Sequence, residues 1–92
     1  MAADISARDG AAAALKSIGE LTGKQTVGVA SLEPTDTGWK VGVEVVEERR
    51  VPSSGDVLAL YETEISLDGD LLSYRRARRY LRGHTGDESG RS

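Results

Sequence analysis

The chain has 92 residues, which suffices for one compact domain with a modest core but not for two. It contains no cysteine, which excludes disulfide bonds, thiolate metal sites and cysteine nucleophiles. The formal net charge of -3 gives no overall field that would draw the protein onto nucleic acid or an anionic membrane. The sequence shows neither an apolar run of roughly 20 residues nor the pattern of a signal peptide, so we expect a cytoplasmic protein.

The first predicted element is a helix from Asp4 to Thr22. Asp4 or Ser6 can cap its first N–H groups, and Gly23 is placed to end it. Gly10 and Gly19 each cost about 1 kcal/mol relative to alanine inside a helix, so the helix needs a sheet beneath it to stay folded. Apolar residues at near-helical spacing predict one narrow buried stripe, formed by Ile5, Ala11, Ala12, Leu15, Ile18 and Leu21.

After Gly23 the hydrophobic period changes to two, which predicts strands. A first strand covers Gln25 to Glu33, turn residues follow from Pro34 to Gly38, and a second strand covers Trp39 to Arg49. The second strand alternates as a half-buried antiparallel strand does. Its predicted core side is Trp39, Val41, Val43 and Val45, opposite Lys40, Gly42, Glu44, Val46 and Glu48.

Two further strands flank the turn Asp68-Gly69-Asp70, because glycine after aspartate readily adopts the positive φ of a hairpin turn. The third strand covers Asp56 to Leu67 and the fourth covers Leu71 to Arg82. The predicted core side of the third strand is Val57, Ala59, Tyr61, Thr63, Ile65 and Leu67, opposite Leu58, Leu60, Glu62, Glu64 and Ser66. Residues 84–92 contain no apolar anchor, so we expect a disordered C-terminal tail.

These elements predict a single α+β domain over residues 4–83. An N-terminal helix packs on one face of a four-stranded antiparallel β-meander, giving a two-layer sandwich. Consecutive strands are expected to be neighbours in the order 1-2-3-4, which places the first and fourth strands at the two edges of the sheet.

Four arginines and two tyrosines lie within seven residues of the predicted fourth strand, in an otherwise acidic chain. We call the segment from Tyr74 to Tyr80 the arginine strand. Its candidate site residues for partner binding are Tyr74, Arg75, Arg76, Arg78, Arg79 and Tyr80.

The two faces of the arginine strand depend on the turn before it. A two-residue turn at Asp68-Gly69 and a three-residue turn that includes Leu67 give registers that differ by one position and exchange the faces. We favour the register that points Leu71, Ala77 and Leu81 inward. Strand alternation then places Ser73, Arg75 and Arg79 with that inward set, and Tyr74, Arg76, Arg78 and Tyr80 on the open face.

Three interpretations of the arginine strand stay open. In a structural one, the arginines pair across strands with Glu62 and Glu64, or with Glu44 and Glu48, and guard the edge against stray strand pairing. In a second, guanidinium groups flanked by tyrosines form a protein-binding surface. In a third, the same groups bind the phosphates and bases of nucleic acid, against which the surrounding glutamates count.

Nothing in the sequence indicates catalysis or metal binding. His84 is the only histidine and falls in the predicted tail, where it has no fixed neighbour. Asp68-Gly69-Asp70 lacks the longer alternation of oxygen ligands that a calcium loop needs. The carboxylate pairs Glu62 with Glu64 and Glu47 with Glu48 come with no evident pocket. We therefore expect no enzyme, no cofactor and no metal.

Three segments together carry a resemblance to a known family: Gly38 to Pro52, Asp56 to Glu62 and Leu72 to Tyr80. They are a tryptophan-led Val/Glu strand ending in arginine and proline, an Asp-Val-Leu-Ala strand with Tyr-Glu, and the Tyr-Arg-Arg-Ala-Arg-Arg-Tyr strand. With these, the chain resembles the gas vesicle protein O family over roughly residues 8 to 83.

The resemblance implies an accessory role, without enzymatic activity, in building the hollow gas-filled shells that give prokaryotic cells buoyancy. The function we expect is binding of the gas vesicle shell protein, or of other accessory proteins, through the arginine strand or an exposed sheet edge. The alternative is a nucleic-acid-binding regulator of gas vesicle production that uses the same arginines. The expected location is the cytoplasm, including the gas vesicle surface.

Overall fold

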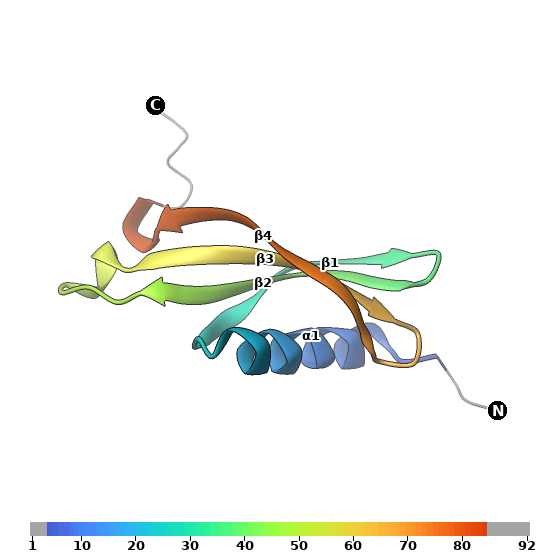
Figure 1. The fold of residues 1–92 in the computed structure, drawn as a ribbon. Helices are drawn as coiled ribbons and strands as arrows, with labels where there is room; N and C mark the ends of the chain where they lie inside the picture. The colour runs from blue at the N-terminus through green and yellow to red at the C-terminus, as the bar shows by residue number, and fades with distance from the viewer. Residues whose placement is uncertain (1–3, 85–92) are drawn as a thin grey trace.

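A computed structural model describes residues 4–84 of the chain. Helix α1 (Ala7–Thr22) is followed by strands β1 (Thr26–Thr35), β2 (Gly38–Glu48), β3 (Val57–Ser66) and β4 (Leu71–Leu81). Short 3-10 turns lie at Ser53–Gly55 (η1) and Arg82–His84 (η2). Helix α1 lies along one face of the sheet, as Figure 1 shows, so the predicted α+β sandwich is confirmed.

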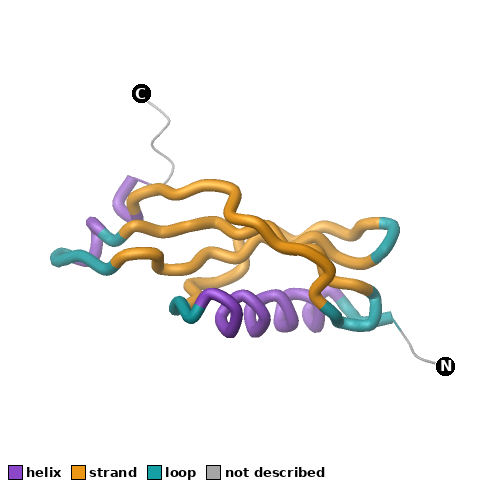
Figure 2. Tube along the Cα trace, viewed as in Figure 1, coloured by secondary structure: helices purple, strands orange, loops and turns teal. Residues whose placement is uncertain are grey.

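The sheet is an antiparallel meander in the order β1-β2-β3-β4, as predicted, with short connections between its strands (Figure 2). Strand β1 runs two residues further than expected, because Pro34 pairs with Trp39 and Thr35 with Gly38. A proline is tolerated there because β1 is an edge strand. The side chain of Thr35 accepts hydrogen bonds from the N–H groups of Thr37 and Gly38, at 3.3 and 3.0 Å, and closes the turn.

Helix α1 has the predicted caps but a different buried stripe. The Ser6 hydroxyl accepts a hydrogen bond from the Asp9 N–H at 3.2 Å, and Gly23 ends the helix with φ 67°. The buried residues are Gly10, Ala14 and Ile18, each one helical turn after the last. The predicted stripe was wrong at Ala12, which is exposed, and at Leu21, which is 53% exposed. The helix contacts the sheet along the line of Gly10, Ala14 and Ile18, and Ala12 and Leu21 lie off that line.

Gly10 lies directly against Trp39 at the start of β2. A Cβ atom at Gly10 would be 2.9 Å from Cδ1 and 3.0 Å from Cγ of the Trp39 ring. The ring is held in place because its Nε1–H donates a hydrogen bond to the carbonyl of Ile5 at 3.2 Å. Gly10 therefore lets the helix approach the sheet closely enough to cover Trp39.

Two glycine substitutions in α1 are expected to have opposite effects on stability. Gly10→Ala should lower the free energy of unfolding by about 1 to 3 kcal/mol, because the methyl group overpacks against Trp39. Gly19→Ala should raise it by up to about 1 kcal/mol, because its Cβ would lie 3.6 Å from Thr26 and alanine favours the helix. Urea unfolding of both variants measures the difference, and equal effects would contradict this packing.

The core lies between α1 and the sheet, and its fully buried members are Ala14, Ile18, Val41, Val43, Val45, Ala59 and Ile65. Trp39, Tyr61 and Leu71 pack against it and are partly exposed. We call the sheet face under α1 the helix side and the other the open side. The open side also contains buried residues, because Val46 and Leu58, which lie there as predicted, are only 6% and 3% exposed.

Asp56 anchors the connection between β2 and β3 to the end of β4. Its side chain is 2% exposed, accepts a hydrogen bond from the Arg50 N–H at 2.7 Å and lies 3.4 Å from the Arg82 guanidinium. The Arg82 N–H also donates to the Asp56 carbonyl at 2.9 Å. The chain then continues into η2, which includes His84. The rest of the predicted tail, residues 85–92, lies outside the described residues.

Candidate functional site

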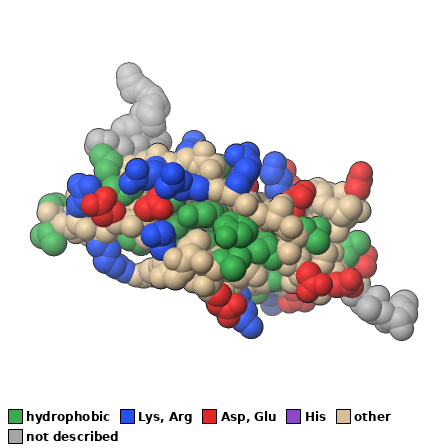
Figure 3. Space-filling model, in the orientation of Figure 1, with side chains coloured by type: hydrophobic (Ala, Val, Ile, Leu, Met, Phe, Trp, Pro, Cys, Tyr) green, Lys and Arg blue, Asp and Glu red, His purple; other side chains and the backbone are tan. Residues whose placement is uncertain are grey.

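The arginine strand lies on β4 at one edge of the sheet, as predicted. Within residues 4–84, β4 pairs only with β3. The side chains of Arg75, Arg76 and Arg79 are 70%, 48% and 50% exposed. In the space-filling view, Lys and Arg side chains gather along this edge (Figure 3). The six candidate residues therefore form a cationic border on an acidic protein.

A bulge divides the arginine strand between the two sides of the sheet. Tyr61 pairs with Arg76 and Leu60 with Arg78, so Ala77 is the extra residue. The expected open-face set is therefore confirmed for Arg78 and Tyr80 and wrong for Tyr74 and Arg76. Tyr74, Arg76 and Arg79 lie on the helix side, whereas Arg75, Arg78 and Tyr80 lie on the open side. Leu71 and Leu81 do pair with Ile65 and Val57 on the helix side, as expected.

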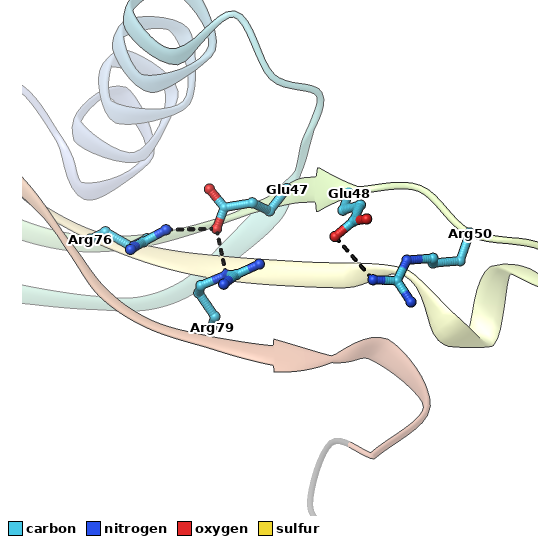
Figure 4. Close-up of polar contacts among 5 residues, drawn as sticks. All are labelled: Glu47, Glu48, Arg50, Arg76 and Arg79. Carbon is cyan, nitrogen blue, oxygen red and sulfur yellow. Dashed lines mark hydrogen bonds and ion pairs between the residues drawn. The ribbon is translucent and has the colours of Figure 1, made fainter.

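On the helix side, two arginines share one carboxylate. Glu47 accepts from Arg76 at 3.0 Å and from Arg79 at 3.2 Å, and its side chain is 13% exposed (Figure 4). The side chain of Glu47 reaches Arg76 and Arg79 because Glu47 is the extra residue of a bulge between Val46 and Glu48 in β2. Two cations on a mostly buried anion make this cluster a brace between β2 and β4.

The same side carries a tyrosine pair. The rings of Tyr61 and Tyr74 lie 6.3 Å apart, tilted by 39°, and Tyr74 is 44% exposed. Tyr61 packs against the core, so it supports the outer ring from below. An exposed aromatic ring on a fixed base is a common anchor at protein interfaces.

On the open side, the pairing is looser. Arg75 forms an ion pair with Glu62 at 2.6 Å. The Arg78 guanidinium lies over the Tyr80 ring, 5.4 Å from its centre, and has no carboxylate partner within residues 4–84. The Tyr80 hydroxyl in turn donates to the carboxylate of Glu44.

A shallow groove of about 300 Å³ opens beside Arg75. It is lined by Lys40, Glu62, Thr63, Glu64, Ser73, Tyr74 and Arg75. Charges of both signs line the groove, so it suits a polar polypeptide surface better than an apolar ligand.

The interaction with Glu44 has a measurable consequence. Burial, together with the hydrogen bond and negative charge of Glu44, raises the pKa of Tyr80 from 10.0 to about 12. Because the folded pKa exceeds the unfolded one, this stabilisation is complete below about pH 10 and is lost as pH rises toward about 12.

Glu44→Gln should lower the pKa of Tyr80, which is measured from the absorbance of the phenolate as the pH is raised. Glu20→Gln on α1 serves as the control, and an unchanged titration in the Glu44 variant would contradict the contact.

The predicted cross-strand partners are confirmed in part. Glu62 pairs with Arg75 as expected, but Glu48 pairs with Arg50 at 3.1 Å, which lowers the pKa of Glu48. Glu64 contacts only Ser73, at 3.5 Å, among the residues of β4. Glu47 was not predicted to pair with the arginines of β4, because regular strand alternation does not allow for the extra residue of a bulge.

No group of three or more His, Cys, Asp or Glu side chains that could hold a metal ion occurs in the described part of the chain. Residues 4–84 also contain no helix that is long and apolar enough to cross a membrane. The contacts of β4 in the described residues include ion pairs, aromatic contacts and strand pairing with β3.

Comparison with known proteins identifies the family. The family model described as "Gas vesicle synthesis protein GvpO" matches residues 1–86. Gas vesicle protein O of Streptomyces sp. (strain CB03234) is 47% identical over 68 residues, which are 74% of this chain and 53% of that protein. Gas vesicle protein O1 of Halobacterium salinarum is 36% identical over 69 residues, 75% of this chain and 58% of that protein.

A third relative, gas vesicle protein O of Haloferax mediterranei, is 31% identical over 70 residues, which are 75% of this chain and 50% of that protein. The chain thus spans about half the length of the curated relatives it matches. No solved structure matches. The match to the family model over nearly the whole chain shows that the chain belongs to the gas vesicle synthesis protein GvpO family.

Proposed function

We propose that this chain is a non-enzymatic accessory protein of gas vesicle assembly, acting in the cytoplasm or at the gas vesicle. It binds the shell protein or another accessory protein through the arginine strand on β4. Membership of the GvpO family supports the gas vesicle role. The observation that carries the docking surface is the exposed row of arginines on an edge that is paired on one side only, within residues 4–84.

Charge supports a protein partner with acidic groups. Within residues 4–84, three of the four arginines of the arginine strand share two carboxylates, those of Glu62 and Glu47, and the fourth, Arg78, pairs with none. This edge therefore keeps positive charge on a protein whose net charge is -3. Arginine and tyrosine are enriched at protein interfaces, and an open strand edge offers main-chain hydrogen bonds to a partner segment.

The open side of β4 is expected to contribute most to this contact. Arg76 and Arg79 are already engaged by the mostly buried Glu47, and withdrawing them would uncover its charge. Arg75 is the most exposed of the three arginines that form ion pairs from β4, and Arg78 contacts the ring of Tyr80 and no carboxylate among residues 4–84. Tyr80 adds an aromatic surface beside these two arginines on the open side, and Tyr74 adds another on the helix side of the same strand.

A pulldown tests the proposed function. The tagged protein, expressed in cells that make gas vesicles, should retain the shell protein or another gas vesicle protein after nuclease treatment. In a second experiment, the same bait is expressed in cells without gas vesicle genes and mixed after lysis with purified gas vesicles. Proteins recovered only in the first experiment are partners during assembly, whereas recovery in the second shows binding to the finished shell. Recovery of no gas vesicle protein from either source would contradict the proposal.

Nucleic acid is the less supported partner, because glutamates already pair with three of the arginines that phosphates would contact. We therefore expect no submicromolar binding of RNA or DNA at physiological salt. Fluorescence anisotropy over a salt series measures it, since binding through several phosphates has a steep salt dependence. Tight, steeply salt-dependent binding would favour the regulatory alternative.

A further inference from the structure

The two ends of the sheet carry opposite charges. At the end where β2 leads into β3 and where β4 finishes, residues 47–56 and 78–83 contain five arginines and three carboxylates. At the other end, the two hairpin turns lie within residues 33–37 and 64–70, which contain five carboxylates and neither lysine nor arginine. We call residues 47–56 and 78–83 the basic end. A charge distribution of this kind orients the protein, basic end first, toward an acidic partner.

The two segments of the basic end form one continuous surface. Turns η1 and η2 pack closely, since a Cβ atom at Gly83 would lie 2.9 Å from the carbonyl oxygen of Ser54. The Asp56 carboxylate accepts a hydrogen bond from the Arg50 N–H at 2.7 Å and lies 3.4 Å from the Arg82 guanidinium. The connection between β2 and β3 is therefore fixed beside the end of the arginine strand.

The connection between β2 and β3 also holds the most exposed large apolar side chain in the described residues, that of Val51, which is 99% exposed. The backbone on both sides of Val51 is fixed, because the Arg50 N–H donates to Asp56 and the Pro52 carbonyl accepts a backbone hydrogen bond at 2.9 Å. An apolar side chain on an ordered loop loses little conformational freedom on binding, which favours its use as a contact with a protein.

The charge of the basic end is only partly neutralised within the described residues. Each of its three carboxylates pairs with an arginine of the same end, and Figure 4 shows two of these pairs. The other two arginines, Arg49 and Arg78, have no carboxylate partner within residues 4–84. Arg49 belongs to the connection between β2 and β3, and Arg78 belongs to β4, so both segments offer a charge to an acidic protein. Nucleic acid fits less well, because its phosphates make no apolar contact with Val51.

We propose that an acidic segment of the gas vesicle partner lies across the basic end, with carboxylates against Arg49 and Arg78 and an apolar side chain on Val51. This inference rests on the proposed function, because it concerns the same partner. It extends the binding surface beyond the arginine strand, past the end of β4, to the connection between β2 and β3. The acidic turns at the other end of the sheet then face away from the partner, where they do not repel it.

Two substitutions in the connection between β2 and β3 test this extension, with the gas vesicle protein that the pulldown recovers as the purified probe. Val51→Asp should weaken its binding about tenfold, because the change removes an apolar contact and sets a negative charge against an acidic segment. Arg49→Ala should also weaken binding about tenfold, through the loss of a charged contact. Val27→Asp is the matched control, since Val27 is 43% exposed on β1, and it should bind as the parent protein does.

A dye at the same position gives a second readout, because the chain has no cysteine of its own. Val51→Cys, labelled with an environment-sensitive dye, should change its emission when the partner is added, and labelled Val27→Cys should not. A partner that binds Val51→Asp and Arg49→Ala as tightly as the parent, but loses affinity for Arg75→Ala combined with Arg78→Ala, would overturn this inference and leave the proposed function standing. Recovery of no gas vesicle protein would overturn both. Submicromolar RNA binding that requires Arg49 would assign the basic end to nucleic acid instead.

Discussion

Asp56→Ala is expected to lower the free energy of unfolding by about 3 kcal/mol, because the Arg50 N–H and the Arg82 guanidinium would lose a carboxylate that is 2% exposed. For a domain of this size, that loss corresponds to a fall in Tm of about 12 to 24 °C. The substitution should also loosen the end of β4, since Arg82 follows directly after the last residue of that strand. Thermal unfolding followed by circular dichroism measures the change.

Asp36→Ala is the matched control, because it removes an exposed aspartate from the turn between β1 and β2. It should change Tm by no more than the small amount typical of surface substitutions. Asp56→Asn should fall between the two, because the amide oxygen can still accept from Arg50 but carries no charge for Arg82. Equal stability of the two alanine variants would show that Asp56 does not anchor this region.

The second large effect concerns binding. Arg75→Ala combined with Arg78→Ala should weaken binding to the gas vesicle partner at least tenfold, because hydrogen bonds to charged groups contribute about 1.5 to 3 kcal/mol each. Within the described residues, this change breaks one exposed ion pair and one cation–π contact, so the fold should persist. Titration of the purified partner against each variant measures the affinity.

Arg8→Ala combined with Lys16→Ala removes the same charge from the exposed side of α1 and controls for the change in net charge. This control should bind as the parent protein does. Arg76→Ala combined with Arg79→Ala is a different test, because it uncovers Glu47 and should lower stability as well as binding. Equal affinity of the Arg75/Arg78 variant and the parent would leave those two arginines with a structural role only.

Much of the architecture could be predicted because local signals agree with the fold. Ser6 and Gly23 mark the two ends of α1, and the Asp68-Gly69 turn separates β3 from β4. Alternation in β2 identified Val41, Val43 and Val45 as core, and all three have 0% exposure. Each of these features depends on neighbouring residues alone, which is why the sequence suffices for them.

The candidate site was predicted in composition but not in arrangement. Its six residues lie on an exposed edge as expected, but the bulge at Ala77 divides them between two sides of the sheet. The bulge at Ala77 could not be predicted, because alanine is not characteristic of bulges, and the same holds for Glu47 at the bulge of β2. The close fit of Gly10 on Trp39 was hidden for a related reason, since it joins residues far apart in the chain.

Amide hydrogen exchange of the free protein and of its complex with a captured gas vesicle protein tests the docking surface most directly. We predict slower exchange in β4, from Leu71 to Leu81, when the partner is bound, with α1 unchanged. Protection confined to α1 or β1, with β4 exchanging as in the free protein, would contradict the assignment of the arginine strand as the binding edge.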